Sequence, residues 1–182
     1  MESIRTGFFK DEIVPVEIPQ RKGDVVIVDT DEEPGRGKAD KIGQMRPAFD
    51  KEGTITAANA SSINDGAAAL TVISNEKADK LEISPLCRIV AHVSAAHEPL
   101  YFTTAPSKAI TQVLTKSSLS IEDIDLFEIN EAFSNVTLAA MREHSIPHDK
   151  VNIHGGAVSL GHPIGASGAR ILVTLISALQ KK

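Results

Sequence analysis

The sequence contains no tryptophan, a single tyrosine and only 4% aromatic residues. A hydrophobic core must therefore be built from valine, isoleucine, leucine and alanine, which favours a mixed or parallel sheet covered by helices. The chain has 182 residues, of which 42% are hydrophobic. At about 150 residues per domain, this is enough for one well-packed domain and part of another.

Cysteine is also nearly absent, since Cys87 is the only one. One cysteine excludes a disulfide framework within the chain and a zinc site built from cysteines. Cys87 does not lie in a glycine-rich or basic stretch that would lower its pKa, so we expect a buried, unreactive thiol. His144 and His148 are four residues apart, but Pro147 breaks the helix between them, and the pair does not predict a zinc site.

Long apolar runs are missing as well, and none approaches the ~20 residues that span a bilayer. The first 19 residues lack the apolar stretch of a signal peptide and include Asp11 and Glu12. The net charge of −5 does not favour binding to nucleic acid or to anionic membranes. We therefore expect a protein that is not secreted, carries no targeting segment on this chain and binds neither nucleic acid nor membranes.

The rest of the chain alternates between strand-like and helix-like segments, which is typical of an α/β fold. Valines and isoleucines alternate in "EIVPVEIP", and its prolines predict an edge strand. Further along, hydrophobic periodicity predicts strands over 67–73, 88–97 and 121–130, of which the last begins with a turn of helix. It predicts helices over 75–82, 104–118, 131–144 and the C-terminal segment from 166.

The motif "FEINEAF" places Asn130 at the carboxyl end of a predicted strand, where ligand sites of α/β sheets lie. Two interpretations remain open on the sequence alone. Asn130 is either an N-cap of the helix that follows, which is the commoner role of asparagine at such a position, or a functional side chain.

The stretch "NIHGGAVSLGHPIGASGAR" holds His162 between Gly161 and Pro163. Glycine allows a close approach of the backbone to a ligand and proline fixes the turn, so the imidazole is held with little freedom. Such a histidine can act as a base or stabilise an oxyanion, although a solvated ring in a turn is an equal alternative. His154 is expected to serve packing.

Two further loops could hold a ligand. The segment "PGRGKADKIGQMRP" carries a cluster of basic residues that suits the phosphates of a nucleotide-like ligand, although a solvated charged loop is the simpler interpretation. The small residues of "TAANASSINDG" could let a ligand chain lie against the backbone, or could form a plain turn.

Three of these stretches together resemble the thiolases, in particular the acetyl-CoA C-acetyltransferases, which join two acetyl-CoA into acetoacetyl-CoA and coenzyme A (CoA) or run the reverse reaction. The matching segments are "RPAF" with "EGTITAANASSINDGAAAL", "NEAF" and "GGAVSLGHPIGASGAR". The resemblance runs through nearly the whole chain. It implies a thiolase-like layered α/β sheet with covering helices and an incomplete C-terminal half.

The resemblance also implies roles for individual residues. His162 would activate a nucleophilic thiol and help to bind the thioester oxyanion, and Asn130 would hold a water in that oxyanion hole. Acetyl-CoA or CoA is the implied substrate, and potassium is an implied ion in some members. The remaining implied residues are Arg36, Gly37, Lys38, Lys41 and Ser61 for CoA, Phe102 and Phe133 for the acyl pocket, and the backbone of Ala57, Ala58, Ala60 and Val158 for potassium.

The sequence departs from the family in its cysteines. The family's chemistry uses two catalytic cysteines and a second histidine, and Cys87 matches neither cysteine. We therefore expect a chain that is catalytically incomplete alone, with residues 1–62 as the end of a loop domain and 63–182 as most of a C-terminal domain. The alternative is a non-catalytic relative that binds CoA or pairs with full-length subunits. The resemblance further implies fatty acid and ketone body metabolism, a dimer or tetramer of the full-length form, and a mitochondrial or cytosolic location.

Overall fold

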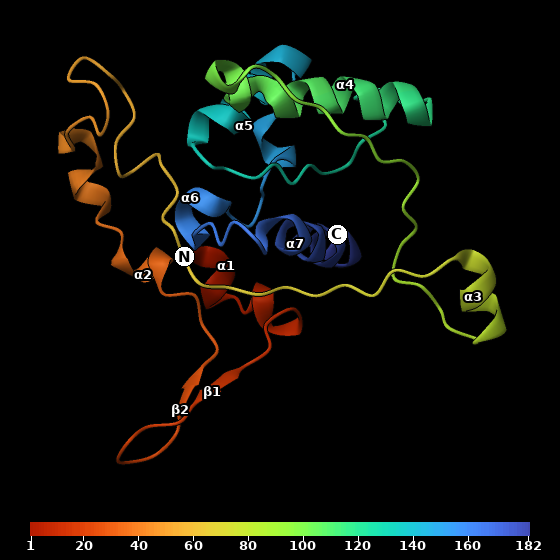
Figure 1. The fold of residues 1–182 in the computed structure, drawn as a ribbon, viewed down its shortest axis with the longest axis horizontal. Helices are drawn as coiled ribbons and strands as arrows, with labels where there is room; N and C mark the ends of the chain where they lie inside the picture. The colour runs from red at the N-terminus through yellow and green to blue at the C-terminus, as the bar shows by residue number, and fades with distance from the viewer.

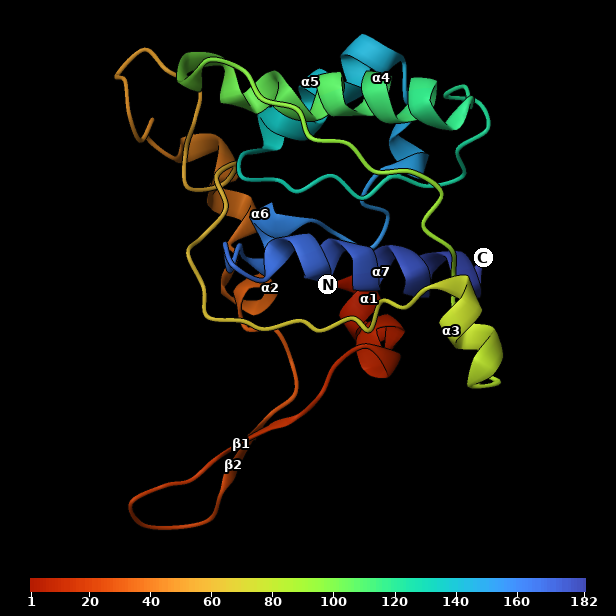
Figure 2. The same ribbon diagram turned by 45° about the vertical axis from the view of Figure 1, so that its right-hand side comes forward.

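Helices dominate the computed structural model, which describes residues 1–182. A central helix, α7, has the N-terminal helices on one side and the pair α4 and α5 on the other (Figures 1 and 2). The α-helices are α1 (Glu2–Arg5), α2 (Glu33–Arg36), α3 (Asn75–Lys80), α4 (Ala105–Ser117), α5 (Ser134–His144), α6 (Ala157–Leu160) and α7 (Ser167–Lys181). The 3-10 helices are η1 (Phe8–Asp11), η2 (Ala39–Gln44), η3 (Pro99–Thr104) and η4 (His148–Lys150).

The main hydrophobic core lies beside α5 and beneath α4. Ala140 and Val136 of α5 are buried there at 0% and 4% exposure, as the periodicity of this segment predicts. The chain before α5 adds Ile129, and the chain after it adds Ile146 and Val151. The residues that flank Asn130 are thereby fixed to the best-packed part of the molecule.

The only sheet is an antiparallel hairpin of β1 (Val16–Ile18) and β2 (Val26–Val28), in which Val16 pairs with Val28. It extends away from the helices (Figures 1 and 2). The prediction of an edge strand in "EIVPVEIP" is confirmed. Every residue of both strands is exposed, so the hairpin leaves apolar side chains such as Val16 and Ile27 in solvent.

The three other predicted strands are wrong. Residues 67–73 and 88–97 are extended but unpaired, and residues 121–130 make one parallel bridge, between Phe127 and Val151. A strand requires a neighbour for its backbone N–H and C=O groups, and the backbone of the first two segments forms no hydrogen bond with the backbone of another segment. Their exposed apolar side chains, such as Val72 and Val90, are the reason the pattern resembled buried strands.

The predicted helices are confirmed as α3, α4, α5 and α7, within a few residues at each end. Helix α7 is tied to the N-terminal segment by Lys181, whose Nζ contacts Asp11 at 2.8 Å and donates to the Phe8 carbonyl. His154 stacks on the Phe8 ring with 3.3 Å between centroids, which confirms its packing role. No helix combines the length and apolar character needed to cross a membrane.

Candidate active site

Asn130 and His162 face each other across 32 residues of sequence, with Asn130 Nδ2 3.4 Å from His162 Nε2. The N-cap interpretation of Asn130 is wrong, because α5 begins only at Ser134, with Phe133 as its N-cap residue. Asn130 Oδ1 is buried and has no hydrogen-bond partner. A buried amide oxygen without a donor is costly, so this atom is available to a ligand or water beside the imidazole.

The backbone of His162 is held by hydrogen bonds from its own N–H to the Ser62 carbonyl at 3.0 Å and to Asn64 Oδ1 at 3.2 Å. Gly161 precedes it with φ +97° and ψ 166°, a conformation that is essentially restricted to glycine. A side chain at position 161 would also meet Asn64, whose Oδ1 would lie 2.3 Å from the new Cβ. The glycine before the histidine is therefore required by both backbone conformation and space.

The imidazole itself is oriented by Ser167, whose Oγ lies 2.7 Å from His162 Nδ1. The Ser167 hydroxyl donates to the Pro163 carbonyl at 3.0 Å, so its oxygen accepts from Nδ1–H. This arrangement leaves Nε2 unprotonated in the neutral ring and directed at Asn130. A histidine in this tautomer can accept a proton at Nε2 while Ser167 stabilises the ring in place.

Glu131 and Asn152 brace the segment that carries Asn130. Asn152, at φ +47°, bonds the N–H of Ile129 through Oδ1 and the carbonyl of Ile129 through Nδ2. Glu131 accepts from Asn152 Nδ2 at 2.8 Å and from the Val158 N–H at 3.1 Å. A Cβ at Gly156 would lie 2.2 Å from the Glu131 carboxylate. The "NEAF" and "HGG" motifs are thus joined by one carboxylate.

Replacing Glu131 with alanine is expected to lower the free energy of unfolding by about 1–3 kcal/mol, because it leaves the Val158 N–H and Asn152 Nδ2 without their acceptor. Glu131→Gln keeps an acceptor oxygen and should lose less. Urea denaturation of the two variants measures the difference. Equal losses in both would show that the hydrogen bonds of Glu131 do not support this segment.

Ser61 and the predicted acyl-pocket residues Phe102 and Phe133 lie at the "NEAF" motif. Ser61 donates from both its N–H and its Oγ to the carbonyl of Ala132, in the "NEAF" motif. Phe102, within η3, lies edge-on to Phe133 with 6.2 Å between ring centroids, and Phe49 meets Phe133 from another direction at 6.0 Å. An apolar cluster of three rings is therefore centred on Phe133, the last residue of the "NEAF" motif that begins at Asn130.

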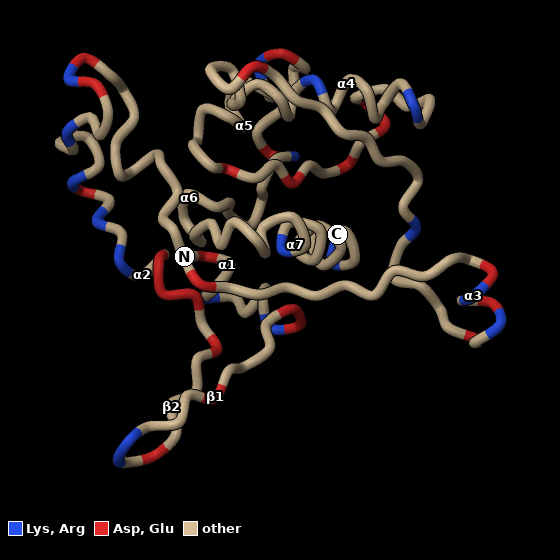
Figure 3. Tube along the Cα trace, viewed as in Figure 1, with Lys and Arg blue, Asp and Glu red and all other residues tan.

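The basic residues follow one another along the segment that leaves α2 (Figure 3). Arg36 is paired with Glu32 and, at 2.8 Å, with Glu33. Gly37, Lys38 and Lys41 are exposed, and neither lysine forms an ion pair. The loop is therefore solvated and still offers free cations.

The structure brings the segment of the predicted potassium residues Ala57, Ala58 and Ala60 against the start of α5. The Ser134 N–H donates to the Asn59 carbonyl, and Ala60 forms a bridge with Phe133. Val158 lies in α6 and contacts Glu131 through its N–H. The carbonyls of Ala57 and Ala58 accept no hydrogen bond.

Cys87 is exposed, so the prediction of a buried thiol is wrong. It lies in the extended segment between α3 and η3, in which residues 81–90 are all exposed. His144 contacts a side chain of the neighbouring helix. Its Nε2 lies 2.8 Å from Ser107 Oγ and joins α5 to α4.

Sequence reasoning missed four residues that hold the pair in place, namely Asn64, Glu131, Asn152 and Ser167. Ser167 lies five residues after His162, so a short-range signal existed for it. The contacts of Asn64 and Asn152 span 98 and 23 residues, and no local pattern indicates such contacts.

Comparison with known proteins identifies the family. Residues 1–76 match the thiolase N-terminal domain, and residues 83–182 match the thiolase C-terminal domain. The chain belongs to the thiolase family. The resemblance expected from its motifs is thereby confirmed, whereas the domain boundary at residues 62 and 63 stays a prediction.

Thiolase relatives match the whole chain. It is 55% identical over 180 residues to an acetyl-CoA acetyltransferase of Yarrowia lipolytica, covering 99% of this chain and 45% of the relative, and 50% identical to one of Thiocystis violacea, covering 99% and 46%. The chain spans about half the length of the curated relatives it matches.

Solved structures of thiolases confirm the α/β fold class. The acetyl-CoA acetyltransferase of Bacillus anthracis matches with a TM-score of 0.94 at 44% identity, over 99% of this chain and 46% of that one. The Acat5 thiolase from Ascaris suum in complex with coenzyme A matches with a TM-score of 0.87 at 43% identity, over 97% and 45%.

Proposed function

We propose that this chain supplies the histidine and asparagine part of an acetyl-CoA C-acetyltransferase site. The observation that carries the proposal is the pair of His162 Nε2 and Asn130 Nδ2, with Asn130 Oδ1 buried and unpartnered beside it. The names of the relatives supply the reaction, which transfers an acetyl group between two acetyl-CoA or cleaves acetoacetyl-CoA.

The mechanism follows from the orientation of the imidazole. His162 Nε2 accepts the proton of a nucleophilic thiol, and Ser167 holds Nδ1–H during the transfer. The protonated ring then presents Nε2–H to the thioester oxygen, where negative charge develops. Asn130 Oδ1 accepts from a water that donates to the same oxygen. The chain in this way contributes both a base and an oxyanion donor from one side chain.

The nucleophilic thiol is the missing component, since transfer through an acyl-enzyme requires an activated thiolate. Cys87 is exposed, and no hydrogen bond joins it to His162 or Asn130. We infer that the 182 residues alone do not complete the reaction. The exposed position of Cys87 equally supports the second candidate, a non-catalytic relative that binds CoA or pairs with full-length subunits.

The same proposal assigns residues to the binding of CoA. Arg36, Lys38 and Lys41, with the backbone at Gly37, would meet its phosphates, Ser61 its pantetheine arm, and Phe102 and Phe133 the acyl group. The support is the pair of unpaired lysines and the ring cluster beside Asn130. A solved relative carries bound coenzyme A, which supports CoA as the ligand.

Potassium belongs to the proposal as an ion held by backbone oxygens of Ala57, Ala58, Ala60 and Val158. Carbonyl oxygens are ligands of hard cations, and those of Ala57 and Ala58 have no donor. The ion would stiffen the loop that carries Ser61. The proposal further includes a dimer or tetramer in the full-length form, a mitochondrial or cytosolic location, and a domain division at residues 62 and 63.

The test measures the affinity of the 182-residue chain for CoA by isothermal titration calorimetry. A second assay measures thiolysis of acetoacetyl-CoA. We expect Arg36→Gln to weaken binding about tenfold or more, because an arginine–phosphate contact is worth about 1.5–3 kcal/mol. Arg21→Gln, which removes an equal charge from the distant hairpin, is the control. We expect no thiolysis above buffer.

Two results would contradict this proposal. Equal CoA affinity in the two arginine variants would exclude the phosphate assignment. Thiolysis that His162→Ala abolishes would show that the chain has its own nucleophile, and Cys87→Ser would then identify it.

A further inference from the structure

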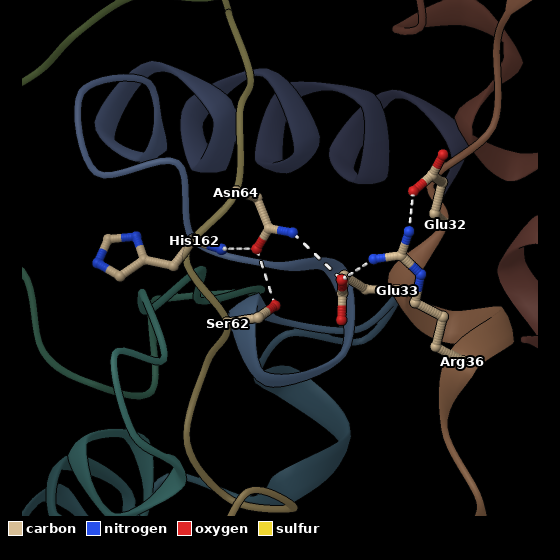
Figure 4. A network of polar contacts seen from close by, with 6 residues as sticks. All are labelled: Glu32, Glu33, Arg36, Ser62, Asn64 and His162. Atoms are coloured by element: carbon tan, nitrogen blue, oxygen red, sulfur yellow. Dashed lines mark hydrogen bonds and ion pairs between the residues drawn. The ribbon is translucent and has the colours of Figure 1, made fainter.

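A continuous set of polar contacts runs from the basic loop to the backbone of His162 (Figure 4). Arg36 Nη1 contacts Glu33 Oε1 at 2.8 Å. The same oxygen lies 3.4 Å from Asn64 Nδ2. Asn64 Oδ1 in turn accepts from Ser62 Oγ at 2.8 Å and from the His162 N–H at 3.2 Å.

Exposure decreases along this network from Arg36 to Glu33, as expected for contacts that carry an effect from the surface toward His162. The side chain of Arg36 is 64% exposed, whereas that of Glu33 is 24% exposed. Asn64 is half-buried against Gly161, which has no side chain to separate them. The imidazole of His162 points away from Asn64 (Figure 4), so the network acts on the backbone and leaves the ring free for chemistry.

We propose that Asn64 is a positioning residue that transmits occupancy of the anion site at Arg36, through Glu33, to the backbone of His162. The inference rests on the proposed function, which assigns Arg36 to the phosphates of CoA. It goes beyond that function because it makes phosphate binding at one end of the ligand alter the histidine at the other.

The direction of the effect follows from charge. Without ligand, Glu33 Oε1 is shared between Arg36 and Asn64. When a phosphate takes the guanidinium, the carboxylate has Asn64 as its remaining donor, and that hydrogen bond shortens. A stronger bond at Nδ2 polarises the Asn64 amide and makes Oδ1 a better acceptor. The His162 N–H is then held more tightly when CoA is present.

The test follows the backbone amide proton of His162 by NMR in the ¹⁵N-labelled chain. Arg36→Gln releases Glu33 without ligand, so we expect a downfield shift, the sign of a stronger hydrogen bond. Glu33→Ala removes the polarising carboxylate, so we expect an upfield shift. Glu32→Ala is the matched control, because Glu32 also pairs with Arg36 but has no contact with Asn64. It should move the resonance less than either variant.

CoA and inorganic pyrophosphate are the ligand probes, the second because it has no aromatic ring to shift the signal directly. Both should move the His162 amide downfield in the native chain, and Asn64→Ala should abolish the movement while CoA still binds. If neither probe binds, the result contradicts the proposed function but not this inference. The three variants measured without ligand still test the link from Glu33 through Asn64 to His162.

Two results would overturn the inference. One is an equal shift in Glu33→Ala and Glu32→Ala. The other is a ligand-induced shift that survives in Asn64→Ala. The side chains of Arg36, Glu32 and Glu33 are at least partly exposed, so these variants keep the test valid if Asn64→Ala fails to fold.

Discussion

Alanine in place of Gly161 is expected to lower the free energy of unfolding by about 1–3 kcal/mol, the cost of an L-residue in this backbone conformation, and to disturb His162 in addition. Gly161 has φ +97° and ψ 166°. The new Cβ would lie 2.3 Å from Asn64 Oδ1, so Asn64 must move, and the His162 N–H loses one of its two acceptors while the Ser62 carbonyl remains. We therefore expect this one substitution both to lower the stability of the chain and to displace the candidate catalytic histidine.

Gly165→Ala is the matched control, because Gly165 lies in the same turn, has no positive φ, and has no atom within 4 Å of a built Cβ. We expect it to be within about 0.5 kcal/mol of the native chain, or slightly more stable. Urea denaturation measures the free energies, and the His162 amide resonance reports the local change. If Gly161→Ala matches Gly165→Ala in both measurements, the strained turn does not position His162.

The sequence predicted local features of the fold well where periodicity decides them. Helix α4 at Ala105–Ser117 and helix α7 at Ser167–Lys181 lie close to the predicted ranges, since their apolar residues repeat at helical spacing. The first strand of the hairpin was also predicted, because prolines on either side of Val16–Ile18 indicate an edge strand, and the apolar start of "DVVIV" indicated the second.

The sequence did not show which of the predicted strands have a partner strand. Residues 67–73 and 88–97 have the composition of strands, yet no backbone of the chain pairs with them, and composition alone does not show whether a partner strand exists. The same limit explains Cys87, whose environment depends on what packs against its extended segment. Local chemistry was similarly insufficient for Asn130, since a capping role depends on where the following helix begins, and α5 begins four residues later.

For the candidate site, the motifs indicated the candidate residues themselves but not the residues that hold them in place. His162 and Asn130 stand in recognisable stretches, and the structure brings them together. Glu131, Asn152 and Asn64 act through contacts between distant parts of the chain. Such contacts are determined by the fold as a whole, so they were visible only once the elements were placed.

Stability is expected to decrease as the pH rises from about 4.5 to 7, and Glu128 is the main reason. Its side chain is 3% exposed, and burial raises its pKa to about 7. Arg170 Nη1 lies 3.6 Å from Glu128 Oε2 and opposes the shift, whereas Glu131 and Glu12 add to it. Neither Glu128 Oε2 nor Arg170 Nη1 has a hydrogen-bond partner, so the pair does not compensate for the burial of the charge.

The sign follows from proton linkage. Between the ordinary pKa of 4.5 and the raised value of about 7, the folded chain retains a proton on Glu128 that the unfolded chain has released. Stability is therefore fully present below pH 4.5 and is lost as the pH rises through about 7. The loss is at most about 3 kcal/mol, at 1.36 kcal/mol for each pH unit of the window. Burial raises the pKa of Glu12 as well, which adds a smaller change of the same sign.

Glu128→Gln replaces the carboxylate with a neutral group of the same shape, so we expect it to flatten this pH dependence and to stabilise the chain at pH 8 relative to the native sequence. Asp125→Asn is the control, because a hydrogen bond from Lys182 lowers the pKa of Asp125 and keeps its titration out of the window. Urea denaturation of all three chains at pH 5, 6, 7 and 8 gives the slopes. If Glu128→Gln keeps the pH dependence of the native chain, another group binds the proton, and Glu128 is excluded as the source of the pH dependence.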